Sequence, residues 1–251
     1  MIRLPVRILY GFYTWTVFLI LSLLALLGML IVPGVERRRR IAHLTARTFL
    51  VAVGMRLRPK GLEQLPAESC IVVANHASYL DGVIMIAVLP PRFGFVIKKE
   101  MGQVPLASLL LRRIGSEFVD RANRHKGAMD ARRMLRRATS GQSFVFFPEG
   151  TFSKQVGLLA FHTGAFATAA RAGIPVVPTI VKGARQALRW NAMVPTPMRI
   201  TVEFTPALRA EDGGRNAAIA LRERARERIL EKLGEPDLAT TRPGDLAPEA
   251  A

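Results

Sequence analysis

The sequence predicts an α/β domain with a mostly parallel sheet flanked by helices, preceded by an N-terminal hydrophobic helical membrane anchor. Two observations predict the domain: short apolar, β-branched runs recur along the chain, and stretches of helical length separate them. A third observation predicts the anchor, because no charged residue occurs between Ile8 and Val32. The 251 residues suffice for one ordinary domain besides that anchor.

The charge-free run from Ile8 to Val32 is the first element. At about 1.5 Å per residue it forms a helix roughly 37 Å long, enough to cross a hydrocarbon core of about 30 Å with some tilt. The run exceeds the roughly 7–15 apolar residues of a signal-peptide core, and no small-x-small cleavage pattern follows it. We therefore expect a retained anchor.

A basic block, ERRRR at residues 36–40, follows the anchor. It predicts that this end of the anchor lies on the cytoplasmic side of the membrane, among anionic lipid headgroups. Arg3 and Arg7 lie at the other end of the apolar run, so the charge asymmetry is imperfect. A helical hairpin in one leaflet is therefore an alternative to a spanning helix, with residues 41–57 as its second limb. Packing of this second limb on the soluble domain fits the sequence equally well.

The domain itself is expected to span residues 58–234, after an anchor at 1–57. Its first segment, 58–69, contains Pro, Gly and charges and is typical of a linker or turn. Strands are expected at 70–74, 94–97, 143–147, 174–181 and 199–204. Helices are expected at 81–89, 104–115, 126–141, 163–173 and, as a charged outer helix, 215–234. The Pro- and Ala-rich tail, 235–251, is expected to be disordered.

Composition narrows the function. Lys and Arg number 36 against 19 acidic residues, a formal charge of +17 that favours anionic partners such as nucleic acids, anionic membranes or phosphorylated small molecules. Only three Tyr and two Trp are present and no nucleic-acid-binding motif occurs, so no nucleic-acid partner is expected. The single cysteine, Cys70, excludes an internal disulfide framework and a cysteine-rich metal site. A G-x-S-x-G elbow, an H-E-x-x-H motif and a P-loop are absent.

Polar residues follow the apolar runs 70–74 and 143–147, at carboxyl ends of strands, where sites in α/β sheets gather. His76 and Asp81 follow the run CIVVA, and a carboxylate bonded to one imidazole nitrogen prepares the other as a base. Positions five apart do not share a helix face, so this contact needs a turn. The alternative is an aspartate that caps a helix beside an unrelated histidine.

Two further clusters of candidate site residues follow predicted strands. Glu149, Gly150 and Thr151 follow the run SFVFF, where Gly150 permits backbone angles that other residues resist; the alternative is an ordinary strand-to-helix turn. A second cluster, Lys98 with Lys99, ends another strand. Lys and Arg bind phosphate, although a single surface charge is usually only solvated.

Together, four ordered motifs resemble the glycerolipid acyltransferase family. They are NHASYLD (75–81), GSEFVDR (115–121), FPEGT (147–151) and IPVVP (174–178), and the resemblance runs from about residue 58 to about 206. It implies that a fatty acyl group passes from acyl-CoA or acyl carrier protein to the free hydroxyl of lysophosphatidic acid, giving phosphatidic acid. Neither a cofactor nor a metal is implied. The alternatives are another lysolipid acceptor, or a membrane-associated scaffold that has lost catalysis.

The resemblance also implies roles for residues. His76 would deprotonate the acceptor hydroxyl, and Asp81 would orient the imidazole. The loop Glu149, Gly150 and Thr151 would help to hold the acceptor lipid, and the basic side chains that would grip its phosphate are Lys98, Lys99 and Arg121. The family often has Arg after Glu-Gly-Thr, whereas this chain has Phe152, with Lys154 as the nearest base. This departure concerns the identity of the acceptor rather than the acyl transfer.

Overall fold

The structure is a computed structural model that describes residues 4–120 and 124–240. Its described part contains a seven-stranded sheet in the order β1-β7-β6-β2-β5-β3-β4, parallel throughout except between β6 and β7. The strands are β1 Arg56–Lys60, β2 Ile71–Ala74, β3 Phe93–Lys98, β4 Glu117–Val119, β5 Ser143–Phe146, β6 Val176–Lys182 and β7 Arg199–Phe204. The predicted fold class is confirmed.

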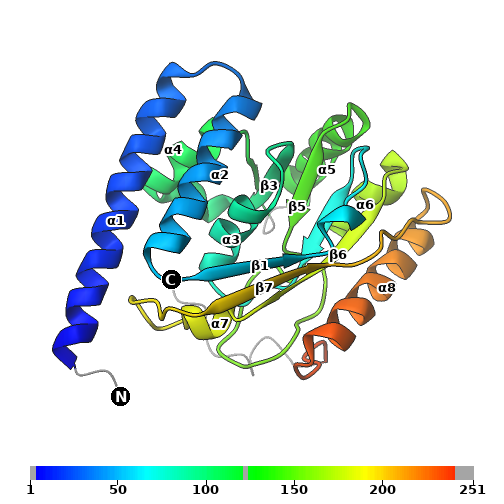
Figure 1. The fold of residues 1–251 in the computed structure, drawn as a ribbon. Helices are drawn as coiled ribbons and strands as arrows, with labels where there is room; N and C mark the ends of the chain where they lie inside the picture. The colour runs from blue at the N-terminus through cyan, green and yellow to red at the C-terminus, as the bar shows by residue number, and fades with distance from the viewer. Residues whose placement is uncertain (1–3, 121–123, 241–251) are drawn as a thin grey trace.

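Helices cover both faces of the sheet (Figure 1). On one face lie α1 Leu4–Ile31, α2 Val35–Ala52, α3 Leu80–Val88 and α4 Pro105–Arg113, which share a hydrophobic core with the sheet. On the other face a second core includes residues of α5 Arg124–Thr139, α6 Gly164–Ala172 and α8 Arg215–Leu233. Three short helices complete the described chain: η1 Leu62–Gln64, η2 Lys99–Gln103 and α7 Ala184–Ala187.

Each of the five predicted apolar runs overlaps a strand, whereas β1 and β4 have no counterpart among the predicted strands. β1 lies at the sheet edge, within and just before the segment expected to be a linker, and pairs with β7. Its sequence, RLRPK, is charged and mostly exposed, so it lacks the apolar alternation by which strands are recognised. β4 has three residues, too few for a periodic signal.

α1 lies along the domain as the first limb of a helical hairpin. Near its start, the hydroxyl of Tyr10 donates to the carbonyl of Val53 at 2.7 Å, and the indole of Trp15 donates to the carbonyl of Met193 at 2.9 Å. Met29, near its end, is buried. Its stretch Pro5–Ile31 is long and apolar enough to cross a membrane.

The second limb of the hairpin, α2, packs on the soluble domain. It lies between α1 and α3, and its residues Phe49 and Leu50 are buried in the first core. Arg39, from the basic block 36–40, is also buried and donates to the carbonyls of Ile114 and Arg92, both at 2.9 Å. Burial lowers the pKa of its guanidinium to about 10. This arginine therefore ties the hairpin to the domain and does not face lipid headgroups.

The first part of the expected disordered tail is ordered. Leu158 donates its N–H to the carbonyl of Pro236 at 2.9 Å, and Leu238 donates to the carbonyl of Leu158 at 3.0 Å. Residues 235–240 therefore pack on the domain, because backbone hydrogen bonds to Leu158 hold this segment in place. These bonds could not be predicted from the Pro-rich sequence. The remainder, 241–251, lies outside the described residues.

Candidate active site

Asn75 fixes the chain where β2 ends. Its side-chain amide donates to the carbonyl of Val181 at 3.0 Å, and its amide oxygen accepts the N–H of Val181 at 2.7 Å. Asn75 is only 3 % exposed, so its side chain continues the pairing of β2 with β6 by one more step. The next residue, His76, thereby emerges from the carboxyl edge of the sheet at a defined position.

His76 and Asp81 are in contact. The imidazole Nδ1 lies 2.8 Å from Oδ2 of Asp81, whose side chain is fully buried. The same oxygen accepts the N–H groups of Ala77 at 2.6 Å and Ser78 at 2.9 Å, which form the turn before α3 begins at Leu80. Asp81 therefore caps this turn and also holds the imidazole, so the alternative of a capping aspartate beside an unrelated histidine is wrong. With Nδ1 facing a carboxylate, Nε2 is the nitrogen available as a base.

Aromatic rings surround the imidazole. Phe147 stacks on it with centroids 4.5 Å apart, and Phe152 meets its edge at 4.9 Å. Tyr79 in turn packs perpendicular to Phe152 at 4.7 Å. The residue that departs from the family pattern thus supplies an apolar wall beside His76 rather than a positive charge. Lys154, the nearest base, places its ammonium 3.9 Å from the ring centroid of Trp190.

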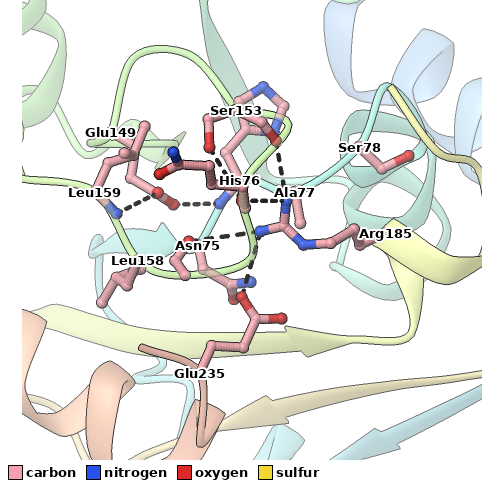
Figure 2. A network of polar contacts seen from close by, with 12 residues as sticks. Asn75, His76, Ala77, Ser78, Glu149, Ser153, Leu158, Leu159, Arg185 and Glu235 are labelled. Atoms are coloured by element: carbon pink, nitrogen blue, oxygen red, sulfur yellow. Dashed lines mark hydrogen bonds and ion pairs between the residues drawn. The ribbon is translucent and has the colours of Figure 1, made fainter. Parts of the chain in front are cut away.

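Glu149 lies beside His76 and joins two loops (Figure 2). Its Oε1 accepts the backbone N–H of His76 at 2.5 Å, and its Oε2 accepts that of Leu159 at 2.9 Å. Only 4 % of Glu149 is exposed, and this burial raises the pKa of its carboxyl to about 8. Both oxygens thus bind backbone groups within the protein, and the contact with the acceptor lipid that the resemblance implies stays a prediction.

Gly150 has the backbone angle expected of it. Its φ is +81°, and its N–H donates to the carbonyl of Phe147 at 3.1 Å, which closes the turn after β5. A side chain in this left-handed conformation would be strained. Thr151 follows and is partly exposed, so its hydroxyl remains a candidate for contact with the acceptor.

The basic cluster lies further along the same sheet edge. Lys98 ends β3, and the ammonium of Lys99 lies 3.2 Å from Oδ2 of Asp120, which follows β4. β5 separates β3 from β2, so the strand bearing Lys98 lies about 10 Å from the strand that leads to His76. Arg121 lies outside the described residues. The phosphate-binding role of these three side chains stays a prediction.

The sequence reasoning missed Arg185. This residue lies in α7, directly after β6, at the same edge as His76. Its guanidinium donates to the carbonyls of Ser153 and Gln155, both at 3.0 Å, so it reaches the loop that carries Phe152 (Figure 2). The only signal was its position after a strand at this edge. Within the described residues, no group of three His, Cys, Asp or Glu is placed to hold a metal ion.

Known proteins are similar to this chain in sequence. The family model described as Acyltransferase matches residues 56–182. A 1-acyl-sn-glycerol-3-phosphate acyltransferase of Cocos nucifera is 29% identical over 172 residues, 68% of this chain and 55% of that protein. One of Haemophilus influenzae is 32% identical over 130 residues, 51% of this chain and 54% of that protein. The chain thus spans about half the length of these two curated relatives.

A solved structure resembles the whole fold. The 1-acyl-sn-glycerophosphate acyltransferase of Thermotoga maritima superposes with a TM-score of 0.76 at 20% sequence identity. The superposition covers 91% of this chain and 95% of that one. The hairpin and the sheet domain are therefore a known arrangement.

Proposed function

This chain belongs to the acyltransferase family, whose model matches half of its length, and on that premise we propose that it acylates lysophosphatidic acid to phosphatidic acid. The observation that carries this proposal is the hydrogen bond between His76 and a buried Asp81 at the carboxyl edge of the sheet. The names of the curated relatives support the acceptor. The alternatives are another lysolipid acceptor and a scaffold without catalysis.

The geometry suits direct acyl transfer. Nε2 of His76 takes the proton of the acceptor hydroxyl, while Asp81 holds Nδ1 and stabilises the imidazolium that forms. The alkoxide oxygen attacks the thioester carbonyl, a C–O bond forms, and collapse of the tetrahedral intermediate breaks the C–S bond. The imidazolium then returns its proton to the departing thiolate. The products are an ester and a free thiol, and no acyl group is attached to the protein.

The acceptor lipid reaches the site from the bilayer, and the donor reaches it from the aqueous phase. The acyl chain of the acceptor stays in the bilayer while its headgroup reaches the sheet edge, where Lys98, Lys99 and Arg121 are the proposed phosphate ligands. The donor, acyl-CoA or acyl carrier protein, is polyanionic at its delivering end and suits a chain of charge +17. Cofactors and metals have no part in this mechanism.

A panel of lysolipids tests the acceptor. Purified protein in mixed micelles is given labelled acyl-CoA, or acyl carrier protein thioester, and lysolipids with phosphate, choline, ethanolamine or glycerol headgroups. We expect the fastest transfer to lysophosphatidic acid. Fast transfer only to a lysolipid with another headgroup would show that the acceptor is a different lysolipid, while the reaction remains an acyl transfer. No transfer to any acceptor from either donor would instead support the scaffold alternative.

We further propose that α1 lies in the plane of one leaflet, with the domain on the cytoplasmic face. Tyr10 bonds to Val53 at the end of α2, Trp15 bonds to Met193 in the domain, and Met29 is buried. The rest of the chain therefore holds α1 from near its start to near its end, and a helix held in this way is not free to cross a bilayer. The outward face of α1 is apolar and more than half exposed at Leu9, Phe12, Leu24 and Leu27. Such a face buries itself in the boundary between headgroups and acyl chains.

An accessibility experiment separates an in-plane helix from a spanning one. An epitope tag is placed at the N-terminus, a second tag at the C-terminus serves as the control, and antibody access is measured before and after permeabilisation of sealed vesicles. We expect both tags on the same side of the membrane. An N-terminal tag on the opposite side from the C-terminal tag would show that α1 spans the bilayer.

A further inference from the structure

Two arginines hold the loop that follows the FPEGT motif: Arg226, which is buried, and Arg185, which is partly buried. We propose that Arg185 and Arg226 are positioning residues for His76, acting through the loop at 152–159 and through the C-terminal strap, which we define as residues 235–238. This inference rests on the proposed function. The strap belongs to the tail that was expected to be disordered, and the proposal gives it a role in keeping the active site in place.

Arg185 gathers the first half of the loop. Its guanidinium donates to the carbonyls of Ser153 and Gln155 at 3.0 Å and of Gly157 at 3.5 Å, and it pairs with the carboxylate of Glu235 at 3.3 Å. The Arg185 side chain is 13% exposed and that of Glu235 is 18% exposed. A planar fork with five donors can bind several carbonyls at once, which an ammonium group cannot match in the same geometry.

Arg226, on α8, gathers the second half of the loop. It donates to the carbonyls of Leu159 at 3.1 Å and Leu158 at 3.0 Å, and it binds both carboxylate oxygens of Asp237, at 3.0 and 2.5 Å. The arginine is 8% exposed, so these bonds lie within the protein. The strap carboxylates thus neutralise both guanidiniums: Glu235 pairs with Arg185, and Asp237 pairs with Arg226.

The packing of the strap leaves no space above Gly157. A Cβ at this position would lie 2.6 Å from Cγ of Leu238 and 2.7 Å from the carbonyl oxygen of Pro236, and its φ of +149° is one that other residues rarely adopt. The strap therefore rests directly on the loop backbone. This close approach is independent of the arginine bonds and indicates the same docked position.

From the loop the contacts reach His76 in two steps. Leu159, whose carbonyl binds Arg226, donates its N–H to Glu149, and Glu149 accepts the N–H of His76 (Figure 2). At the other end of the loop, Phe152 packs against the imidazole edge at 4.9 Å. A shift of the loop would therefore move both the backbone and the ring contacts of the base. A misplacement of about 1 Å in a reacting group can cost about 10²-fold in rate.

The test compares Arg185→Gln, Arg185→Lys and Glu235→Gln with the wild type in the lysolipid assay. We expect Arg185→Gln to lower kcat by about 10–100-fold with KM for donor and acceptor changed by less than about threefold, because the reacting geometry is lost while substrate contacts remain. Arg185→Lys should recover part of that loss. Glu235→Gln should lower kcat in the same direction by a smaller factor. Arg209→Ala is the control, since this exposed arginine binds Glu68 and the carbonyl of Gly173, outside the loop.

Gly157→Ala tests the strap without touching an arginine. The added methyl group must push the strap or the loop away, so we expect kcat to fall while the charged pairs are unaltered in sequence. Wild-type kcat in folded Arg185→Gln and Gly157→Ala proteins would overturn the inference. Equal losses in Arg185→Gln and Arg209→Ala would also overturn it, because they would indicate general destabilisation. An inactive wild type would instead contradict the proposed function itself.

Discussion

Replacement of His76 by alanine is expected to lower kcat for acyl transfer by about 10²–10⁴-fold, because a positioned general base is removed. The protein should remain folded, since the His76 side chain is partly exposed and Asp81 keeps the N–H groups of Ala77 and Ser78 as donors. The measurement is the initial rate of phosphatidic acid formation at saturating donor and acceptor, together with the circular dichroism spectrum of each protein.

Two further variants make the His76 result specific. Asp81→Asn removes the charge that stabilises the imidazolium, so it should lower kcat as well, but it also disturbs the turn before α3 and should reduce stability. Tyr79→Phe is the matched control, because Tyr79 is 57% exposed and its ring contact with Phe152 is kept. A folded His76→Ala protein with wild-type turnover would remove His76 from the mechanism.

Replacement of Glu149 by glutamine is expected to reduce both stability and turnover. Two backbone N–H groups, those of His76 and Leu159, now bind the two carboxylate oxygens, whereas an amide offers one oxygen and turns an NH₂ group toward the other donor. One buried N–H left without an acceptor costs about 1–3 kcal/mol. We expect a loss of unfolding free energy in that range and a fall in kcat of about 10–100-fold, because the backbone of the base loses its brace.

The pH dependence of stability identifies the Glu149 carboxyl. Burial raises its pKa to about 8, above the model-compound value of 4.5, so the folded protein binds this proton more tightly than the unfolded chain does. The resulting stabilisation is fully present below pH 4.5 and is lost as pH rises toward 8. Its slope is at most about 1.4 kcal/mol per pH unit.

Urea unfolding in detergent between pH 5 and pH 9 measures this slope. We expect wild-type stability to decline across the range and the decline to be shallower in Glu149→Gln, which has no carboxyl to titrate at that position. The same slope in both proteins would show that another group is responsible. Asp237→Asn is a control for charge alone, because the pKa of Asp237 is lowered by its bond to Arg226 and it does not titrate in this range.

The apolar strands could be predicted from their own residues, whereas the spacing of His76 and Asp81 left their contact open and the family resemblance implied it. Buried parallel strands are continuous apolar runs, and β2, β5 and β6 are buried over almost all of their length. The contact needs only a turn between Ala77 and Leu80, which is local information. Local sequence could also predict the long helix α1, since an uncharged run of that length has few other structures.

The parts that could not be predicted depend on contacts distant in sequence. Arg39 belongs to a basic block of the kind that binds lipid headgroups. In the fold it is buried, and it donates to carbonyls 53 and 75 positions away in the sequence. Arg185 and Arg226 likewise bind backbone carbonyls. Every residue has a backbone carbonyl, so the sequence does not indicate which ones an arginine will bind. The family resemblance implied a role for Glu149 in holding the acceptor, whereas the bond of Glu149 to Leu159 depends on the folded position of the loop.

Rapid quenching after mixing the enzyme with labelled acyl thioester tests most directly that His76 serves as a base for direct transfer. Without an acceptor, we expect no protein-bound acyl label and no burst of free thiol. With lysophosphatidic acid, we expect labelled phosphatidic acid within one turnover in the wild type and almost none in His76→Ala. A labelled acyl-protein formed without acceptor, with a matching burst of thiol, would show a covalent intermediate and exclude direct transfer.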